Sequence, residues 1–275
     1  MSADQSLAGQ VAVVTGGTQG LGEAIARRFA AMGAAGLVLC GRQEAAGQAV
    51  AAEITAGGCP ARFVTADLAS VEEAQGVVAA ADRAFGRVDA LVNAAGITDR
   101  GTLFDTSPEL FDRMFAVNVR APFFLMQAAA KIMRRERIAG AIVNILSMSA
   151  HGGQPFIAAY SGSKGALATL TKNAAFSLLP DRIRVNGLNV GWMATPGEDA
   201  IMRRYHGAED GWLEAAARQQ PFGRLIDPDE VARACAFLVG PQSGLMTGAV
   251  IDYDQSVLGC YEGAPHPTKA LELPA

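Results

Sequence analysis

The stretch Thr15-Gly-Gly-Thr-Gln-Gly-Leu-Gly22 decides the fold of this 275-residue chain. It follows the nearly continuous apolar run Val11–Thr15, which is typical of a strand buried on both faces of a parallel sheet. After it, apolar residues recur at the spacing of a helix, namely Leu21, Ile25, Phe29 and Met32. A glycine-rich turn that leads directly from such a strand into a helix indicates an α/β protein.

The same alternation of short apolar runs and longer helical segments continues along the chain. We expect further strands at Leu37–Cys40, Ala61–Thr65, Ala90–Asn93, Ala141–Ile145, Arg184–Asn189 and Ala249–Tyr253. This repetition predicts a single-domain, Rossmann-type, doubly wound parallel sheet with helices on both faces. With 50% hydrophobic residues, the chain can fill one large core.

Three capping patterns predict where helices begin. Ser70–Glu73, Thr106–Glu109 and Asp227–Glu230 each place a side-chain oxygen three residues before a glutamate. The last two also carry a proline near the first turn, where helices tolerate it.

Two regions break the alternation. The segment 191–222 follows the sixth expected strand and is longer than a strand–helix connection needs, so we expect a loop that closes over substrate. The segment 256–275 contains Pro265, Pro267 and Pro274, which favour an irregular tail. The expected organisation is therefore one domain over residues 1–255, including the substrate loop 191–222, followed by a C-terminal tail over 256–275.

Composition excludes several classes of function. The net charge is -4 and the charges are interspersed, so no basic patch is offered to nucleic acid or to an anionic membrane. No apolar run approaches the roughly 20 residues of a membrane helix, and the segment 1–10 lacks the features of a signal peptide. The four cysteines are scattered, without metal-ligand spacing, at Cys40, Cys59, Cys235 and Cys260. We expect a soluble cytoplasmic protein with reduced thiols and no metal.

The glycines of the opening turn have separate physical uses. Gly16, Gly20 and Gly22 permit a tight turn, the close approach of a pyrophosphate and close packing of the helix on the sheet. The N-terminus of that helix offers free N–H groups and a positive dipole end to phosphates. The pattern indicates a dinucleotide site, and a glycine-rich turn without a ligand is the alternative.

The segment Tyr160-Ser-Gly-Ser-Lys164 places a phenol and an ammonium group on one face of a helix. A free tyrosine titrates near pH 10, about three units above neutrality. A fixed cation nearby favours the phenolate and lowers that pKa, which would suit proton transfer. Taken alone, such a pair is also common on solvated helix faces.

The spacing T-G-x-x-x-G-x-G resembles the shorter branch of the short-chain dehydrogenase/reductase family, and further matches span nearly the whole chain. Asp67-Leu68 matches the adenine-contacting pair, and Asn93-Ala-Ala-Gly96 matches the turn beside the cofactor. The family's catalytic residues match Asn118, Ser147 (thirteen residues before the tyrosine), Tyr160 and Lys164, in that order.

The resemblance implies an NAD(P)(H)-dependent oxidoreductase that interconverts a secondary alcohol and a ketone by hydride transfer. Tyr160 would exchange the proton, and Lys164 would hold the nicotinamide ribose and lower the pKa of that tyrosine. Ser147 would hydrogen-bond the substrate oxygen. Asn118 would help to hold a water molecule that connects Lys164 to solvent, and the cofactor would carry the hydride.

The resemblance also implies a set of cofactor-binding residues: Gly16, Thr18, Gln19, Gly20, Leu21, Gly22, Arg42, Asp67, Leu68, Asn93, Ala94, Gly96, Tyr160, Lys164, Gly191 and Thr195. Gly41 occupies the position of the acidic residue that reads the ribose of NAD, and Arg42 follows it. Since a guanidinium can form bidentate hydrogen bonds with a phosphate, NADP(H) is favoured and NAD(H) is the alternative. Against this, Thr18-Gln19 lacks the basic residue of many NADP-binding members.

The chain departs from the family pattern at two places. Val190 stands where a proline is usual before Gly191, so the backbone approach to the carboxamide end of the cofactor could differ. Asp254-Gln255-Ser256 replaces the usual Asp-Gly-Gly.

The substrate residues are expected after the catalytic serine and after the sixth strand. We assign Ser147, Ser149, Gln154 and Trp192, with His151 and Asn189 as neighbours. Polar groups beside an aromatic face suit a sugar or polyol, whereas an acyl or apolar ketone is the alternative substrate. Trp192 and Trp212 could equally serve only to pack the segment over the core.

Two other classes of function remain alternatives. A nucleotide-binding sensor need not keep the tyrosine, lysine and serine together. A sugar-nucleotide epimerase or dehydratase of the longer branch resembles T-G-x-x-G-x-x-G and adds a larger C-terminal domain. The helical segments 108–133 and 157–179 match those that form dimers and tetramers in the family, so we expect a homotetramer or homodimer.

Overall fold

A computed structural model describes residues 6–260 and 271. One seven-stranded sheet, with every neighbouring pair parallel, runs in the order β3-β2-β1-β4-β5-β6-β7. Its strands are β1 (Val11–Thr15), β2 (Gly36–Gly41), β3 (Ala61–Thr65), β4 (Ala90–Asn93), β5 (Ala141–Ile145), β6 (Arg184–Val190) and β7 (Val250–Tyr253). The predicted fold class is confirmed, and the expected strands agree within a residue at each end.

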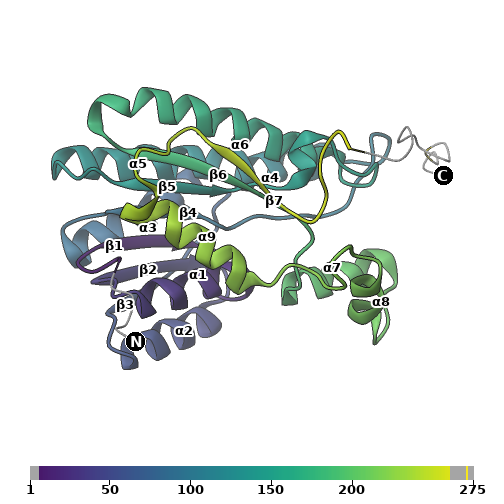
Figure 1. Cartoon of the computed structure of the whole chain (residues 1–275), viewed down its shortest axis with the longest axis horizontal. Coiled ribbons are helices and arrows are strands. Elements are labelled where there is room, and N and C mark those ends of the chain that lie inside the picture. The colour runs from purple at the N-terminus through teal and green to yellow at the C-terminus, as the bar shows by residue number, and fades with distance from the viewer. Residues whose placement is uncertain (1–5, 261–270, 272–275) are drawn as a thin grey trace.

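Helices cover both faces of the sheet (Figure 1). They are α1 (Gly20–Ala31), α2 (Glu44–Ala56), α3 (Val71–Phe85), α4 (Pro108–Phe115), α5 (Ala121–Arg135), α6 (Ala158–Ser177), α7 (Pro196–His206), α8 (Trp212–Arg218) and α9 (Pro228–Val239). Short turns are η1 (Ala116–Arg120, π-helical) and the 3₁₀ turns η2 (Met148–His151), η3 (Leu179–Asp181) and η4 (Pro241–Ser243).

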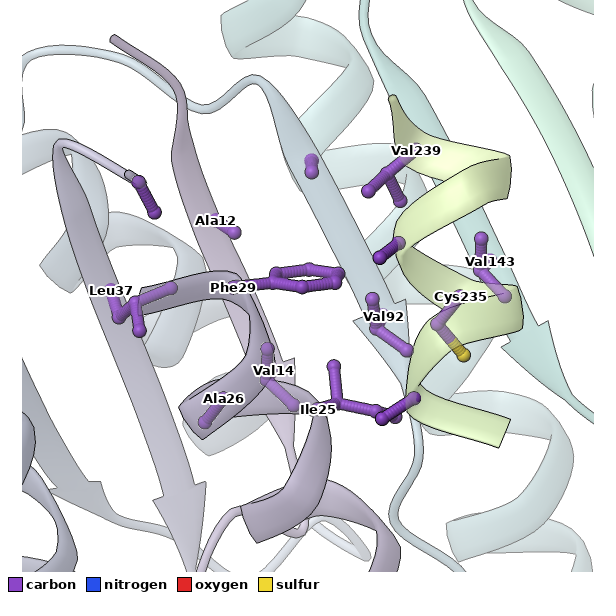
Figure 2. Packing of buried hydrophobic residues seen from close by; sticks show 14 of the residues in the cluster. Ala12, Val14, Ile25, Ala26, Phe29, Leu37, Val92, Val143, Cys235 and Val239 are labelled. Atoms are coloured by element: carbon purple, nitrogen blue, oxygen red, sulfur yellow. The ribbon is translucent and has the colours of Figure 1, made fainter. Parts of the chain in front are cut away.

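The core lies in two layers because successive side chains of each buried strand point to opposite faces. On one face, α1, α2 and α9 pack on the sheet, and Figure 2 shows Phe29 of α1 beside Val92 of β4, with Val239 of α9 nearby. On the other face, α3, α5 and α6 cover residues such as Val13 of β1.

The strand order reverses between β1 and β4, because the chain runs outward from β1 to β3 and then returns to β1's other side. Ligands of open α/β sheets bind at the carboxyl ends of the strands where the order reverses. The glycine turn follows β1 and Ala94–Gly96 follows β4, so the topology brings both segments to this position.

Two of the three predicted helix caps are confirmed. Ser70 accepts a hydrogen bond from the N–H of Glu73 at 3.2 Å, and Asp227 forms a capping box with Glu230. The third is displaced by one residue: Ser107 caps α4. Thr106 instead donates to the carbonyl of Thr102, a hydrogen bond that stabilises the preceding turn.

The segment 191–222 is not the expected loop, because most of it forms α7 and α8. Thr195 caps α7 by accepting from the N–H of Glu198 at 3.1 Å. Figure 1 shows these two helices set apart from both helical layers, beyond the end of the sheet. Of the expected tail, residues 261–270 and 272–275 lie outside the described residues. None of the described helices is long and apolar enough to span a membrane.

Candidate active site

The glycine turn has the shape that a diphosphate requires. Gly16 has φ +71°, and a Cβ there would lie 3.0 Å from the Cα of Ala95. A Cβ on Gly22 would lie 2.2 Å from the carbonyl oxygen of Gly16, so no side chain fits. The N-cap residue of α1, Gln19, makes no side-chain cap hydrogen bond. The first N–H groups of α1 can therefore bind an anion, and this turn fits the predicted cofactor.

A continuous cleft runs along the carboxyl edge of the sheet. Its lining includes most of the predicted cofactor residues: Gly16, Thr18, Gln19, Gly20, Leu21, Gly22, Arg42, Asp67, Leu68, Ala94, Gly96, Tyr160, Lys164, Gly191 and Thr195. Asn93 is the exception, since it is buried in β4 and donates from Nδ2 to Oδ1 of Asn144 at 2.8 Å. Its side chain therefore links β4 to β5 and does not line the cleft.

Three charged side chains meet at one end of the cleft, namely Asp67, Arg113 and Arg42. Arg113 Nη2 lies 3.3 Å from Asp67 Oδ2, an ion pair that the sequence patterns did not suggest. The N–H of Ala69, and then Arg113 and Arg42, lower the pKa of Asp67 against the opposing effect of burial, so it is ionised at neutral pH. Arg42 lines the cleft and forms no hydrogen bond or ion pair with the described residues.

Gly41 carries a steric constraint beside this end. A Cβ on Gly41 would lie 2.8 Å from Cγ2 of Thr18, which belongs to the glycine turn. The missing side chain at position 41 therefore makes room for the methyl group at position 18.

The catalytic candidates converge from two elements. Tyr160 and Lys164 lie on α6, and Ser147 follows β5 and lines the same cleft. Lys164 Nζ lies 5.7 Å from the ring centroid of Tyr160 and donates to the carbonyl of Ile145 at 2.8 Å. Ser147 Oγ lies 2.9 Å from Oγ of Ser149. The phenol, the ammonium and the hydroxyl thus lie at one place along the cleft.

Burial acts on both titrating groups, in opposite directions. It lowers the pKa of the Lys164 ammonium to about 8, which still leaves that group protonated at pH 7. It raises the pKa of Tyr160, while a hydrogen bond with Ser147 lowers it. Two further charges reach the phenol, because Glu198 raises its pKa and Arg100 lowers it. The phenolate therefore depends on the positive charges placed around it.

Asn118 is fully buried in the π-helical turn η1 and lies beneath the cleft rather than in its lining. Its Oδ1 accepts from the N–H of Ile97 at 3.0 Å, and its Nδ2 donates to the Ile97 carbonyl at 3.0 Å and to Ser163 Oγ at 3.1 Å. A Cβ on Gly96 would lie 3.3 Å from Asn118 Oδ1 and 3.6 Å from Lys164 Nζ. The carboxamide therefore fixes the turn in which Gly96 lies near Lys164.

The far end of the cleft holds the substrate candidates Ser149, Gln154 and Trp192, together with Ser147. The structure places the two predicted neighbours elsewhere: His151 and Asn189 are absent from the lining. Both instead contact Oδ1 of Asp252, at 2.9 Å and 2.8 Å. Asp252 on β7 pairs in the sheet with Asn189 on β6, so this contact draws both side chains towards the sheet edge.

Sequence reasoning missed two charged residues in this part of the cleft. Arg100 follows β4 and Glu198 lies in the first turn of α7, and both line the cleft. Their side chains are 14% and 19% exposed. One signal could have found Glu198: Thr195-Pro-Gly-Glu198 repeats the capping pattern that predicted other helices. Nothing in the sequence placed Arg100 opposite it.

Comparisons with known proteins agree with this architecture. The family model described as enoyl-(acyl carrier protein) reductase matches residues 16–256. Galactitol 2-dehydrogenase of Agrobacterium fabrum is 31% identical over 251 residues, covering 89% of this chain and 96% of that protein. NADP-dependent (R)-specific alcohol dehydrogenase of Lentilactobacillus kefiri is 33% identical over 246 residues, covering 88% and 94%.

A solved structure described as a short chain dehydrogenase/reductase family protein gives a TM-score of 0.78 at 36% sequence identity, covering 91% of this chain and 97% of that one. Fold, motif order and relatives agree over nearly the same residues. The chain therefore belongs to the short-chain dehydrogenase/reductase family and is an oxidoreductase that acts on CH–OH groups.

Proposed function

We propose that this enzyme interconverts a small polyhydroxylated secondary alcohol and its ketone, with NADP(H) as the preferred cofactor and Tyr160 as the proton-transferring residue. The observation that carries the proposal is the meeting of Tyr160, Lys164 and Ser147 at one place in the cleft. The glycine turn, which fits a diphosphate, lines the same cleft.

Each residue at this place in the cleft has a separate role in the proposed reaction. The nicotinamide cofactor, when bound, supplies or accepts the hydride. In reduction, Ser147 donates a hydrogen bond to the substrate oxygen as negative charge develops there, and Tyr160 donates the proton. In oxidation, the phenolate of Tyr160 takes the proton from the alcohol. Burial raises the pKa of this phenol and Arg100 lowers it, and we assign a further stabilisation of the phenolate to the Lys164 ammonium, 5.7 Å from the ring centroid.

Asn118 acts as a positioning residue in this proposal. Its hydrogen bonds to both backbone groups of Ile97 fix the turn that carries Gly96 beside Lys164. The water-mediated connection from Lys164 to solvent, which the family resemblance implies, stays a prediction.

The preference for NADP(H) rests on position 42. The guanidinium of Arg42 lines the cleft without a partner among the described residues, and Gly41 offers no carboxylate to repel a 2′-phosphate. The Lentilactobacillus relative is NADP-dependent by name, which supports this choice. NAD(H) is the second candidate because Thr18 and Gln19 supply no basic group.

A polyol substrate is favoured by the polarity of the far end of the cleft. Ser149, Gln154, Arg100 and Glu198 provide hydrogen-bonding groups there, beside the half-buried indole of Trp192. A relative named for its action on galactitol agrees with this class. An apolar ketone would cover Arg100 and Glu198 without offering a hydrogen bond to Nη2 of the one or Oε2 of the other, which is unfavourable.

We also propose a cytoplasmic homotetramer or homodimer. Three large apolar side chains are exposed on the helices expected to associate, namely Phe111, Phe123 and Phe176. The four cysteines are free thiols, as is usual in a reducing compartment. Light scattering coupled to size exclusion would measure the assembly, and a monomer at micromolar concentration would contradict it.

A spectrophotometric screen at 340 nm tests the proposed function. Secondary alcohols, polyols and the corresponding ketones are offered with NADP(H) and with NAD(H). We expect turnover of polyols, faster with NADP(H), that is lost in Tyr160→Phe. Nucleotide binding without turnover of any substrate would instead favour the sensor.

A further inference from the structure

Two opposite charges face each other across the far end of the cleft. Arg100 Nη2 lies 3.7 Å from Oε1 of Glu198, with both side chains largely buried. This separation exceeds the distance of a normal hydrogen bond. The two groups form an ion pair without a direct hydrogen bond between these atoms.

The guanidinium of Arg100 is held in place by other contacts. Its Nε donates to Nε2 of His206 at 3.1 Å, and its Nη1 donates to the carbonyl of Thr98 at 2.9 Å. Its Cζ lies over the ring of Phe156, 5.5 Å from the ring centroid. Nη2 has no hydrogen-bond acceptor among the described residues, so this donor is fixed in position and available.

The carboxylate of Glu198 is fixed in a similar way. Its Oε1 accepts from the indole Nε1 of Trp192 at 2.9 Å, and the indole ring is stacked on that of Trp212 with centroids 6.1 Å apart. Its Oε2 accepts no hydrogen bond from the residues that the structure describes. Burial raises the pKa of this carboxyl, whereas the Trp192 hydrogen bond and Arg100 lower it.

The pair is not needed to hold α7 against the segment that follows β4. Tyr205 of α7 already donates to Oδ1 of Asp99 at 2.8 Å, and Arg204 lies 3.6 Å from the same oxygen. Arg100 and Glu198 are instead turned into the cleft, within electrostatic reach of the Tyr160 hydroxyl. Their position is that of groups that meet the substrate beside its reacting carbon.

We propose that Arg100 and Glu198 jointly select a neutral substrate that carries a second hydroxyl group near the reacting carbon, as in a diol or polyol. This inference rests on the proposed function and assigns its specificity to two residues. A hydroxyl accepts and donates at once, so one oxygen can accept from Arg100 Nη2 and donate to Glu198. Because the two atoms are 3.7 Å apart, an oxygen to one side of the line between them can lie within hydrogen-bond distance of both.

The same pair disfavours charged substrates. A carboxylate that is attracted to Arg100 meets the carboxylate of Glu198, and an ammonium group that is attracted to Glu198 meets the guanidinium. A mono-alcohol offers no second hydroxyl group, so Arg100 Nη2 and Glu198 Oε2 gain no hydrogen bond from it in the complex. A neutral hydroxyl group can accept from Arg100 and donate to Glu198, so it satisfies both at once.

The experiment compares three substrates with a common carbon skeleton: 2-butanol, 2,3-butanediol and 2-hydroxybutanoate. The ratio of kcat/KM for the diol to that for the mono-alcohol is measured in the wild type, Arg100→Gln and Glu198→Gln. Arg203→Gln is the control, because Arg203 lies on α7 but pairs with Asp199 and Asp210 outside the cleft lining.

We expect both cleft variants to lower the diol-to-mono-alcohol ratio by about tenfold or more, the usual loss for a hydrogen bond to a charged group. Glu198→Gln should also raise kcat/KM for 2-hydroxybutanoate relative to 2-butanol, because a repelling carboxylate is removed. The control should keep the wild-type ratio.

Turnover of both alcohols with an unchanged ratio in Glu198→Gln would overturn the inference and leave the proposed function standing. Turnover of no alcohol by the wild type would overturn the proposed function, and this inference with it. Glu198→Gln keeps the side-chain length and an acceptor for Trp192, so it tests the pair even if Arg100→Gln does not fold.

Discussion

Replacing Gly41 by aspartate should turn the cofactor preference towards NAD(H) only if Thr18 is made smaller at the same time. The new Cβ would lie 2.8 Å from Cγ2 of Thr18, well inside the 3.5–4.0 Å of a normal carbon–carbon contact. Overpacking of this kind typically costs about 1–3 kcal/mol. In Thr18→Ser the offending methyl is absent, and the next atoms, Oγ1 and Cβ of residue 18, lie at 3.4 Å and 3.7 Å.

The backbone at position 41 does not have a positive φ, so an aspartate is compatible with its conformation. In the double variant Thr18→Ser/Gly41→Asp, the carboxylate would accept from the ribose hydroxyls of NAD(H) and repel the 2′-phosphate of NADP(H). We expect the Kd ratio to move towards NAD(H) by about 10- to 150-fold, which corresponds to 1.5–3 kcal/mol for a charged hydrogen bond.

The assay is a titration of NADPH and NADH into the wild type, both single variants and the double variant, with melting temperatures recorded in parallel. Gly41→Asp alone should melt several degrees lower than the double variant, because only it retains the close contact. A double variant that melts like the wild type yet keeps the wild-type Kd ratio would refute the placement of the 2′-phosphate beside this residue.

Four further outcomes are expected. Tyr160→Phe should lower kcat by about 100-fold or more while nucleotide still binds, since only the transferable proton is lost; retention of a tenth of the activity would contradict its role. Lys164→Ala should weaken nucleotide Kd as well as kcat, and an unchanged Kd would separate Lys164 from the ribose. Glu198 raises the pKa of Tyr160 and Arg100 lowers it. The pH at which the oxidation rate rises should therefore be lower in Glu198→Gln and higher in Arg100→Gln than in the wild type. Shifts of both variants in the same direction would contradict this prediction. Trp192→Ala should reorder kcat/KM among alcohols with nucleotide Kd within about threefold, whereas an unchanged order with a lower melting temperature would show that Trp192 only packs.

The strands were predictable because a strand buried on both faces must be apolar along its length. Val11–Thr15 and Ala141–Ile145 were read from the sequence with the bounds that the structure gives. The cap at Ser107 was misplaced by one residue because two hydroxyl residues precede Pro108, and the sequence does not say which of them faces the helix.

The sequence marks α7 poorly because Thr195 fits two roles, a contact with the cofactor and the N-cap of a helix that begins before Glu198. α7 also has no fully buried residue, so it lacks the apolar stripe by which helices are recognised. The sequence could not predict that Arg100 and Glu198 face each other. They are 98 positions apart, and only the tertiary fold sets the distance between them.

The position of Asn118 depends on the number of residues in the π-helical turn Ala116–Arg120, and not only on which side chains the turn carries. Each residue of an α-helix advances it by about 100°, so deleting one residue here would rotate everything before it against everything after it by roughly that angle. Asn118 would then lose its hydrogen bonds to the N–H and the carbonyl of Ile97, although every side chain that lines the cleft would be unchanged. A scan of substitutions would leave this register intact at every position, and only a single-residue deletion would expose it.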